Sequence, residues 1–153
     1  MKKRLLSVVC VMVMILSVSI INVRASEQMV DGSYLTNDEE SVGEAVLVMR
    51  GEDLQTGTSK VSKSSSTTIA AGGTTAAKHV VDEIGIIVAV ERLKVGTSSW
   101  YFYRSWEKEK YDSSYVTSSK TLTVAKGYYY RVRCTHWANS DVSSSFTNGV
   151  LLN

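Results

Sequence analysis

The pair of residues best suited to nucleophilic chemistry is Cys134 and His136, which lie two positions apart. Alternate residues of a β-strand project from the same face, so a strand here would make the thiol and the imidazole neighbours. An imidazole beside a thiol favours the thiolate, which is the nucleophilic form. However, no Asn or Asp is identifiable that would orient the histidine, and Tyr130 and Val132 occupy the same face. We therefore expect a buried thiol beside a packed histidine.

A second group of reactive side chains comprises His79, Asp82 and Glu83. Imidazole and carboxylate groups ligate zinc or exchange protons, but this spacing matches no closed zinc site. The chain contains only 2 histidines, which argues against a histidine-rich metal centre. We therefore expect neither a metal nor another cofactor.

Signatures of hydrolases and of phosphate-binding proteins are missing from the sequence. Residues 96–100, Gly-Thr-Ser-Ser-Trp, do not match the Gly-x-Ser-x-Gly nucleophile elbow of α/β-hydrolases. No glycine-rich phosphate loop is present. The sequence does not give the separation of paired carboxylates, and Glu91, Glu107 and Glu109 are more typical of surface charge. An enzymatic role is therefore the less favoured interpretation.

Aromatic side chains gather at 100–106 and 128–130. Alternation places rings on both faces of the first segment, and only one face can meet a core. Rings with hydrogen-bonding neighbours stack on sugars or form protein contacts. The alternative is that the second layer of rings packs under loops or shields arginine stems. The residues that we expect to make contacts are Tyr101, Tyr103, Tyr129, Arg131 and Arg133.

The clearest structural pattern lies at 120–136, where two alternating segments flank Lys126 and Gly127. Period-two alternation of aromatic and β-branched residues predicts half-buried antiparallel strands. Gly127 is the residue expected to adopt a positive φ at the intervening turn. After the turn, the residues that share one face are Tyr128, Tyr130, Val132 and Cys134.

Further strands are predicted before this stretch and after it. Residues 84–95 are the most apolar run after the N-terminal segment, and with 100–108 they predict a hairpin across the turn at 96–99. The other expectations are strands at 44–50, 54–61 and 146–152, a sharp bend at 71–73, a strand or short helix at 74–81, and a charged loop at 108–114. Seven or eight short strands at this spacing predict an all-β fold, an antiparallel β-sandwich.

The N-terminus has the pattern of a secretory signal peptide over residues 1–25. Basic residues precede a long apolar run, and Val23 and Ala25 occupy the −3 and −1 positions of a cleavage site. An uncleaved anchor is the alternative, because the run approaches the ~18–20 residues that span a bilayer. Cys10 lies inside the apolar run rather than after it, which argues against a lipoprotein. The predicted signal peptide would form a helix before cleavage.

Cleavage changes the charge and thiol content of the mature chain. Four of the 17 basic residues leave and all 15 acidic residues stay, so the net charge becomes −2. Nothing in this balance favours nucleic acid or, after cleavage, an anionic membrane as a partner. Cys134 alone remains, so no internal disulfide can form. We expect a polar arm at 26–43 and a single β-sandwich domain at 44–153.

Several segments resemble an uncharacterised family of small secreted proteins of Gram-positive bacteria, chiefly clostridia and relatives, a domain of unknown function. They are Gly-Ser-Tyr-Leu-Thr at 32–36, residues 73–82, Val-Glu-Arg-Leu at 90–93, Trp100, Lys-Gly-Tyr-Tyr-Tyr-Arg-Val-Arg at 126–133, His136, Ala138, and Ser-Phe-Thr-Asn-Gly at 145–149. The chain departs from the family at Cys134 and Trp137, where small residues are usual. The resemblance implies secretion and an all-β fold, but no activity.

These patterns favour a secreted, non-enzymatic binding or interaction module outside a Gram-positive cell. Its partner would be cell-wall glycan or another extracellular protein. A small secreted toxin-like or antimicrobial protein is the alternative, because size and export fit equally well. A cell-wall or glycan hydrolase with scattered acidic residues is the second alternative.

Overall fold

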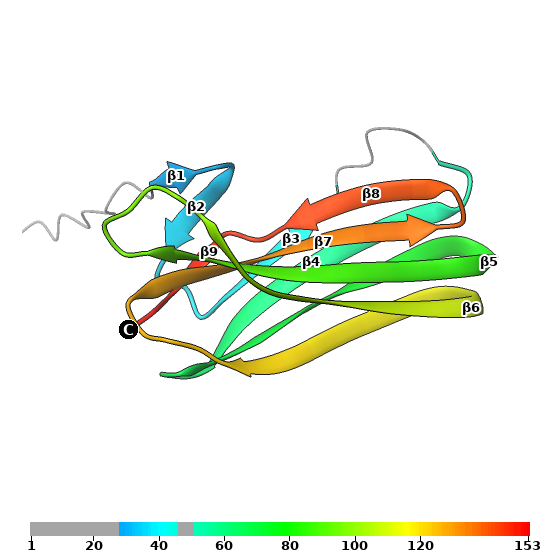
Figure 1. Cartoon of the computed structure of the whole chain (residues 1–153). Coiled ribbons are helices and arrows are strands. Elements are labelled where there is room, and N and C mark those ends of the chain that lie inside the picture. The colour runs from blue at the N-terminus through cyan, green and yellow to red at the C-terminus, as the bar shows by residue number, and fades with distance from the viewer. Residues whose placement is uncertain (1–27, 46–50) are drawn as a thin grey trace, which may run out of the picture.

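The computed structural model describes residues 28–45 and 51–153, and this part of the chain is all-β, as predicted (Figure 1). It contains no helix long and apolar enough to cross a membrane. The predicted signal-peptide helix and most of the predicted strand at 44–50 lie outside the described residues. The nine strands are β1 (Met29–Val30), β2 (Ser33–Thr36), β3 (Glu40–Glu44), β4 (Leu54–Ser65), β5 (Thr68–Lys94), β6 (Tyr101–Thr123), β7 (Tyr128–Ala138), β8 (Asp141–Phe146) and β9 (Gly149–Leu152).

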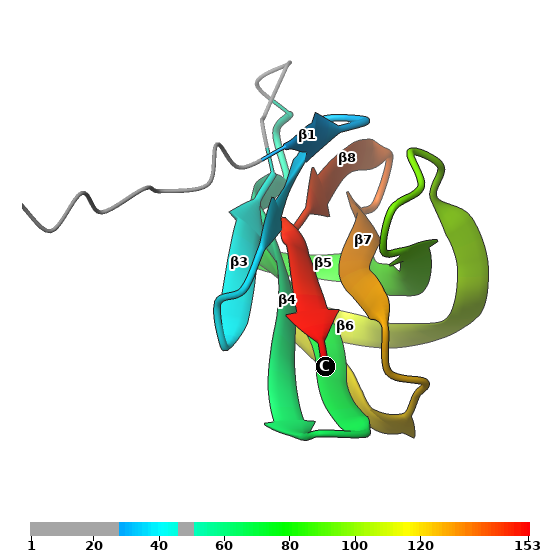
Figure 2. The ribbon, with the colours of Figure 1, turned by 90° about the vertical axis from the view of Figure 1, so that its left-hand side faces the viewer.

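The sheet is organised around β5, which is 27 residues long. β6 pairs with β5 along most of its length, whereas β4 pairs with its first part and β7 with its second part. The strand order is β1-β2-β9-β7-β5-β4-β3, with β8 on β7. All pairs are antiparallel except β2 with β9. The strands therefore form one curled, mixed sheet, a half-barrel, in place of a purely antiparallel arrangement (Figure 2).

The curl brings β4 against β7 and β8, to which it is not paired. Glycines permit this approach. A Cβ at Gly57 on β4 would overlap the ring of His136 on β7, and a Cβ at Gly73 on β5 would crowd the Sγ of Cys134 on β7. Residues 71–73, predicted as a sharp bend, are therefore regular strand. The absence of side chains at Gly72 and Gly73 provides room for neighbouring strands rather than a turn.

The core lies on the concave face of the curled sheet. Alternate residues of β5, Ile84, Ile86, Val88 and Val90, are fully buried there. They pair in register with the predicted inward face of β7, including Val132 and Cys134. Other members of the core are Leu54, Val61, Ile69, Val116, Leu122, Tyr130, Val150 and Leu152. Branched aliphatic side chains on a pleated, half-buried surface account for the strand preference of these segments.

The charged segment 108–114, predicted as a loop, continues β6 as strand. Its backbone is paired with β5 from Ile86↔Lys108 to Val81↔Ser113. β6 lies at an edge of the sheet, so charged and tyrosine side chains reach solvent from either face, and polarity alone is compatible with a strand. Residues 74–81, predicted as a strand or short helix, also belong to a strand, β5.

Gly127 adopts a positive φ of 78°, as predicted. The strands on either side of it, β6 and β7, nevertheless do not pair with one another, because each pairs with β5. The Gly127 amide instead donates to the Leu152 carbonyl at 2.7 Å, and its carbonyl accepts from Val95 at 3.1 Å. The turn thus joins β9 and the end of β5, and it does not close a hairpin.

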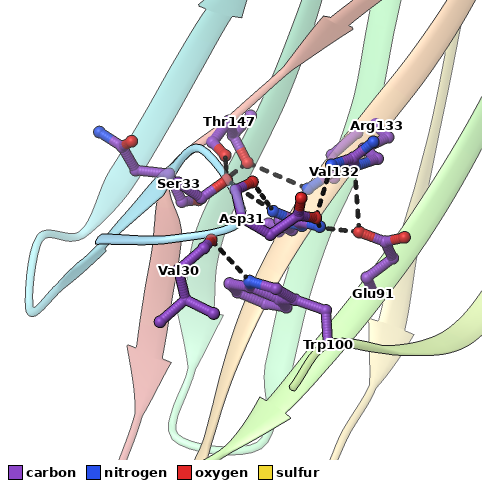
Figure 3. Close-up of polar contacts among 10 residues, drawn as sticks. Val30, Asp31, Ser33, Glu91, Trp100, Val132, Arg133 and Thr147 are labelled. Atoms are coloured by element: carbon purple, nitrogen blue, oxygen red, sulfur yellow. Dashed lines mark hydrogen bonds and ion pairs between the residues drawn. The ribbon is translucent and has the colours of Figure 1, made fainter. Parts of the chain in front are cut away.

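Much of the stretch predicted as a polar arm, 26–43, forms strands of the sheet. β1 and β2 form a hairpin at Asp31 and Gly32, both with positive φ. β2 pairs with β9, and β3 pairs with β4. The hairpin covers part of the convex face of the sheet near Arg131 (Figure 3).

Candidate functional site

The most extensive polar cluster joins the β1–β2 hairpin to β5 and β7 (Figure 3). Arg131, on β7, is only 1% exposed. Its Nε donates to Glu91 Oε2 at 2.6 Å and its Nη2 to Asp31 Oδ2 at 2.6 Å. Its Nη1 donates to the Asp31 carbonyl at 2.9 Å and to Ser33 Oγ at 3.0 Å. The guanidinium lies 4.3 Å from the ring centroid of Trp100.

Local structure explains why these groups meet. Glu91 and Arg131 are direct cross-strand partners of β5 and β7. The positive φ of Asp31 turns the hairpin so that both its carbonyl and its carboxylate face Arg131. The Trp100 indole nitrogen donates to the Val30 carbonyl at 3.0 Å and so ties the loop before β6 to the hairpin.

Arg133 joins the same carboxylates from a more exposed position. Its Nη2 donates to Asp31 Oδ2 at 2.8 Å. Its Nε lies 3.2 Å from Glu91 Oε2 but lacks hydrogen-bond geometry, so these two groups form an ion pair without a hydrogen bond. The hydrogen bond from Arg131, and then the charges of both arginines, hold the pKa of Asp31 below its usual range. The cluster is thus a balanced set of two arginines and two carboxylates.

The five predicted contact residues do not form one surface. Arg131 is buried with its donors occupied, so it is not available to a partner. Arg133 and Tyr129 are half-buried. Tyr103 is also half-buried, and its hydroxyl donates to the Thr123 carbonyl at 3.0 Å. Tyr101, in contrast, is 63% exposed.

Two half-buried rings, those of Tyr103 and Tyr128, belong to an arginine–tyrosine stack. The guanidinium of Arg92 lies 5.4 Å from the ring centroid of Tyr103 and 5.1 Å from that of Tyr128. Tyr103 also meets Tyr130 edge-on, at 6.0 Å between centroids. This arrangement corresponds to the alternative in which the rings shield arginine stems.

The exposed aromatic side chains of β6 were only partly found by sequence reasoning. Phe102 is 66% exposed, and Tyr111 and Tyr115 are also exposed. The last two lie in or beside 108–114, the segment that the sequence predicts as a charged loop rather than a strand. A signal was present, because aromatic residues recur along 101–115 with no glycine, proline or asparagine between them.

His136 is fully buried between two hydroxyl groups rather than beside a reactive thiol. Thr75 Oγ1 donates to the Gly85 carbonyl at 3.0 Å, so it accepts a hydrogen bond from His136 Nδ1 at 2.8 Å. His136 Nε2 then accepts from Ser145 Oγ, also at 2.8 Å. Burial lowers the pKa of His136 to about 4. The neutral tautomer with a proton on Nδ1 satisfies every polar group of this set.

Cys134 shares the concave face with His136, as predicted, and is buried. Its Sγ lies 3.9 Å from the Gly72 carbonyl oxygen, and burial raises the pKa of the thiol to about 12. The folded protein therefore holds the thiol in its unreactive form.

We expect Cys134 to react with a thiol reagent such as DTNB at least about a hundredfold more slowly in the native protein than in 6 M guanidinium. The reason is that both thiolate formation and access require opening of the core. The measurement is the absorbance of the released thiolate at pH 8. Equal rates in the two conditions would contradict the buried position.

The second predicted group, His79, Asp82 and Glu83, does not converge on one centre. His79 Nε2 lies 2.9 Å from Asp53 Oδ1, whereas Glu83 Oε1 accepts from the indole of Trp137 at 2.8 Å. Within residues 28–45 and 51–153, no three His, Cys, Asp or Glu side chains are placed to hold a metal ion.

Comparison with known proteins found no matching family model, no matching curated protein and no matching solved structure. The resemblance to small secreted proteins of Gram-positive bacteria therefore stays a prediction from the sequence. What the described residues define is a class of fold, an all-β half-barrel with an internally paired arginine cluster.

Proposed function

We propose that this chain is a secreted, non-enzymatic interaction module that acts outside a Gram-positive cell. It binds an extracellular protein partner along β6. The observation that carries this proposal is the free edge of β6. Over its 23 residues, β6 pairs with β5 and with no other strand of the described chain. An unpaired edge offers a row of backbone donors and acceptors to an incoming strand.

Side chains on β6 support the same role. Tyr101, Phe102, Tyr111 and Tyr115 are all exposed along this one strand. Aromatic residues carry much of the binding energy of protein interfaces because they bury a large area at low entropic cost. A partner strand at this edge would be flanked by these rings.

The charges of β6 favour a different protein over a second copy of this chain. Glu107 and Glu109 project from one face of the strand, and Lys108 and Lys110 from the other. Symmetric antiparallel pairing centred on Lys108 would place Glu107 opposite Glu109, and pairing centred on Glu109 would place Lys108 opposite Lys110. Like charges directly opposite each other are destabilising. A partner strand with the reverse alternation of charge avoids this repulsion.

Sequence patterns support the remaining parts of the proposal. The basic, apolar and small-residue order of 1–25 supports export, and the family resemblance supports a Gram-positive host. The packing of β4 against β7 supports the finer prediction of sandwich-like layers within the curled sheet. Toxin-like and hydrolase roles stay as alternatives from the sequence alone.

The test is a pull-down from culture medium and cell-wall extract with the mature chain, alongside a glycan array. We expect a protein partner whose affinity falls at least about tenfold in the Tyr101→Ser/Phe102→Ser variant. Tyr34→Ser, which removes an exposed tyrosine from β2, is the matched control and retains binding. Binding to glycans alone, or equal affinity of all three proteins for the partner, would overturn the assignment to β6.

A further inference from the structure

A shallow hollow of about 310 Å³ lies on the convex face of the sheet, away from the core. Its apolar surface comes from Ile87 on β5, Trp137 on β7 and Val142 on β8. Ile87 and Val142 are exposed, although both are large aliphatic residues. We call this feature the Trp137 hollow. The arginine cluster does not line it, and neither does the concave core.

The position of the indole is set by the strand register. Trp137 lies opposite Gly85 on β5 and opposite Val142 on β8. A Cβ at Gly85 would overlap the six-membered ring of Trp137, so the ring extends across β5 at a position where only glycine leaves room. The indole nitrogen donates to Glu83 Oε1 at 2.8 Å, which fixes the orientation of the ring.

Three carboxylates surround this apolar surface. Glu107 and Glu109 of β6 line the hollow, and Glu83 holds the indole. No ion pair within the described residues involves any of the three. Lys108 and Lys110 project from the opposite face of β6 because side chains alternate along a strand.

The carboxylates at the rim of the hollow lie close enough together to repel one another. A hydrogen bond with Glu107, followed by desolvation and the charges of Glu107 and Glu83, raises the pKa of Glu109. Tyr111 adds a second ring beside the rim, with its hydroxyl 3.4 Å from Glu109 Oε2. An incoming positive charge would therefore relieve repulsion that the chain itself leaves uncompensated.

We propose that the Trp137 hollow binds a primary ammonium group on an apolar stem, the lysine side chain of a protein partner. Such a group offers three N–H donors to the carboxylates of Glu83, Glu107 and Glu109. Its methylene stem lies along Ile87 and Val142, and its charge lies against the indole, the ring with the strongest cation–π attraction. The site shares Glu107 and Glu109 with β6, but it does not require the strand pairing proposed at the edge of β6.

The test is an NMR titration that follows the indole N–H signal of Trp137, assigned with the Trp137→Phe variant. The probes are N-acetyl-lysine methylamide and N-acetyl-norleucine methylamide, which share the apolar stem and differ in the ammonium group. We expect a saturable shift with the lysine probe and at least about tenfold weaker binding of the norleucine probe. Equal shifts with both probes, or no saturable shift with the lysine probe, would overturn the proposal.

A paired set of variants identifies the carboxylates as the cause. The Glu107→Gln/Glu109→Gln variant keeps the shape of the rim and removes its charge, so we expect about tenfold weaker binding of the lysine probe. Glu40→Gln, on β3 far along the sheet, is the control and leaves binding unchanged. The dispersion of the amide spectrum checks that each variant is folded. Unchanged affinity in the double variant would also refute the site.

Discussion

The Arg131→Ala variant is expected to lose about 3–5 kcal/mol of unfolding free energy, whereas Arg133→Ala loses about 1 kcal/mol or less. Both arginines contact the same two carboxylates, those of Asp31 and Glu91. They differ in burial, because the side chain of Arg131 is 1% exposed and that of Arg133 is 42% exposed. Comparison of the two variants therefore isolates the effect of burial, because both arginines have the same carboxylate partners.

The large loss at Arg131 has three physical sources. Truncation leaves the carboxylate of Glu91 partly buried with only a poorly oriented contact from Arg133. It also removes the donors to the Asp31 carbonyl and Ser33 Oγ, which join the β1–β2 hairpin to β7. The stem and guanidinium that pack on Trp100 are lost as well.

Urea unfolding followed by tryptophan fluorescence measures both losses, provided that the m values agree with that of the wild type. Arg131→Lys, which keeps the charge and most of the stem, gives a folded comparison if the alanine variant does not fold. Its loss should be smaller than that of Arg131→Ala, because one of several hydrogen bonds survives. Equal destabilisation by the two alanine substitutions would show that burial of Arg131 contributes nothing.

Alternation of apolar and polar residues predicted the strands that have one face in the core and the other face outside it. Alternate residues of β5 and β7 occupy the concave core as the pattern predicts, namely Ile84, Ile86, Val88, Val90, Tyr130, Val132 and Cys134. The opposite face of β5 also carries apolar residues, yet it is covered at Leu93 and exposed at Ile87. The difference arises from tertiary packing rather than from the local sequence. The β1–β2 hairpin and the Trp100 loop reach only one end of this face.

Glycine residues and charged residues led to two wrong predictions, because each type occurs both in turns or loops and in strands. Gly72 and Gly73 have the signature of a bend, but here they admit side chains from neighbouring strands. The alternating charges at 107–110 have the signature of a loop, but an edge strand tolerates them equally well. Only the pairing partner distinguishes these cases, and pairing with β5 is not a local property of either segment.

The candidate site was the least predictable part of the chain. Arg131 was expected on an open face because it alternates with inward-facing residues. Its burial depends on Asp31, 100 positions away, and on Glu91, 40 positions away. No periodic pattern links such distant residues, so the arginine looked like a surface side chain. Likewise, nothing in the sequence places Trp137 across Gly85 or brings Glu83 to its indole.

Between pH 6.5 and pH 4, the free energy of unfolding is expected to fall by about 3 kcal/mol because of His136. Burial lowers the pKa of this side chain from 6.5 to about 4 in the folded state. Within this window the unfolded chain binds a proton that the folded chain does not, so stability decreases as the pH falls. Well above pH 6.5 both states are neutral at this site and the contribution is constant.

The surroundings of His136 explain why its protonation is costly. Its ring nitrogens face the hydroxyls of Thr75 and Ser145, and its carbon edge lies against Gly57. A proton on Nε2 would replace the hydrogen bond accepted from Ser145 by one that must be donated. Among the described residues, no carboxylate is hydrogen-bonded to the ring to balance the charge. The lowered pKa values of Asp31 and Asp141 act at lower pH, because their stabilisation is lost only as the pH falls below 3.8.

Urea unfolding at intervals from pH 4 to pH 8 measures the effect, with two histidine variants as a matched pair. In His136→Gln the neutral amide retains hydrogen-bonding capacity but does not titrate, so the slope between pH 4 and pH 6.5 should largely disappear. His79→Gln replaces the exposed histidine beside Asp53 and should retain the slope of the wild type. A slope that persists in His136→Gln would assign the acid sensitivity to carboxylates, and a slope lost in His79→Gln would assign it to the surface pair. The window itself is diagnostic, because a histidine held neutral by burial destabilises the fold at a pH where most carboxylates are still ionised.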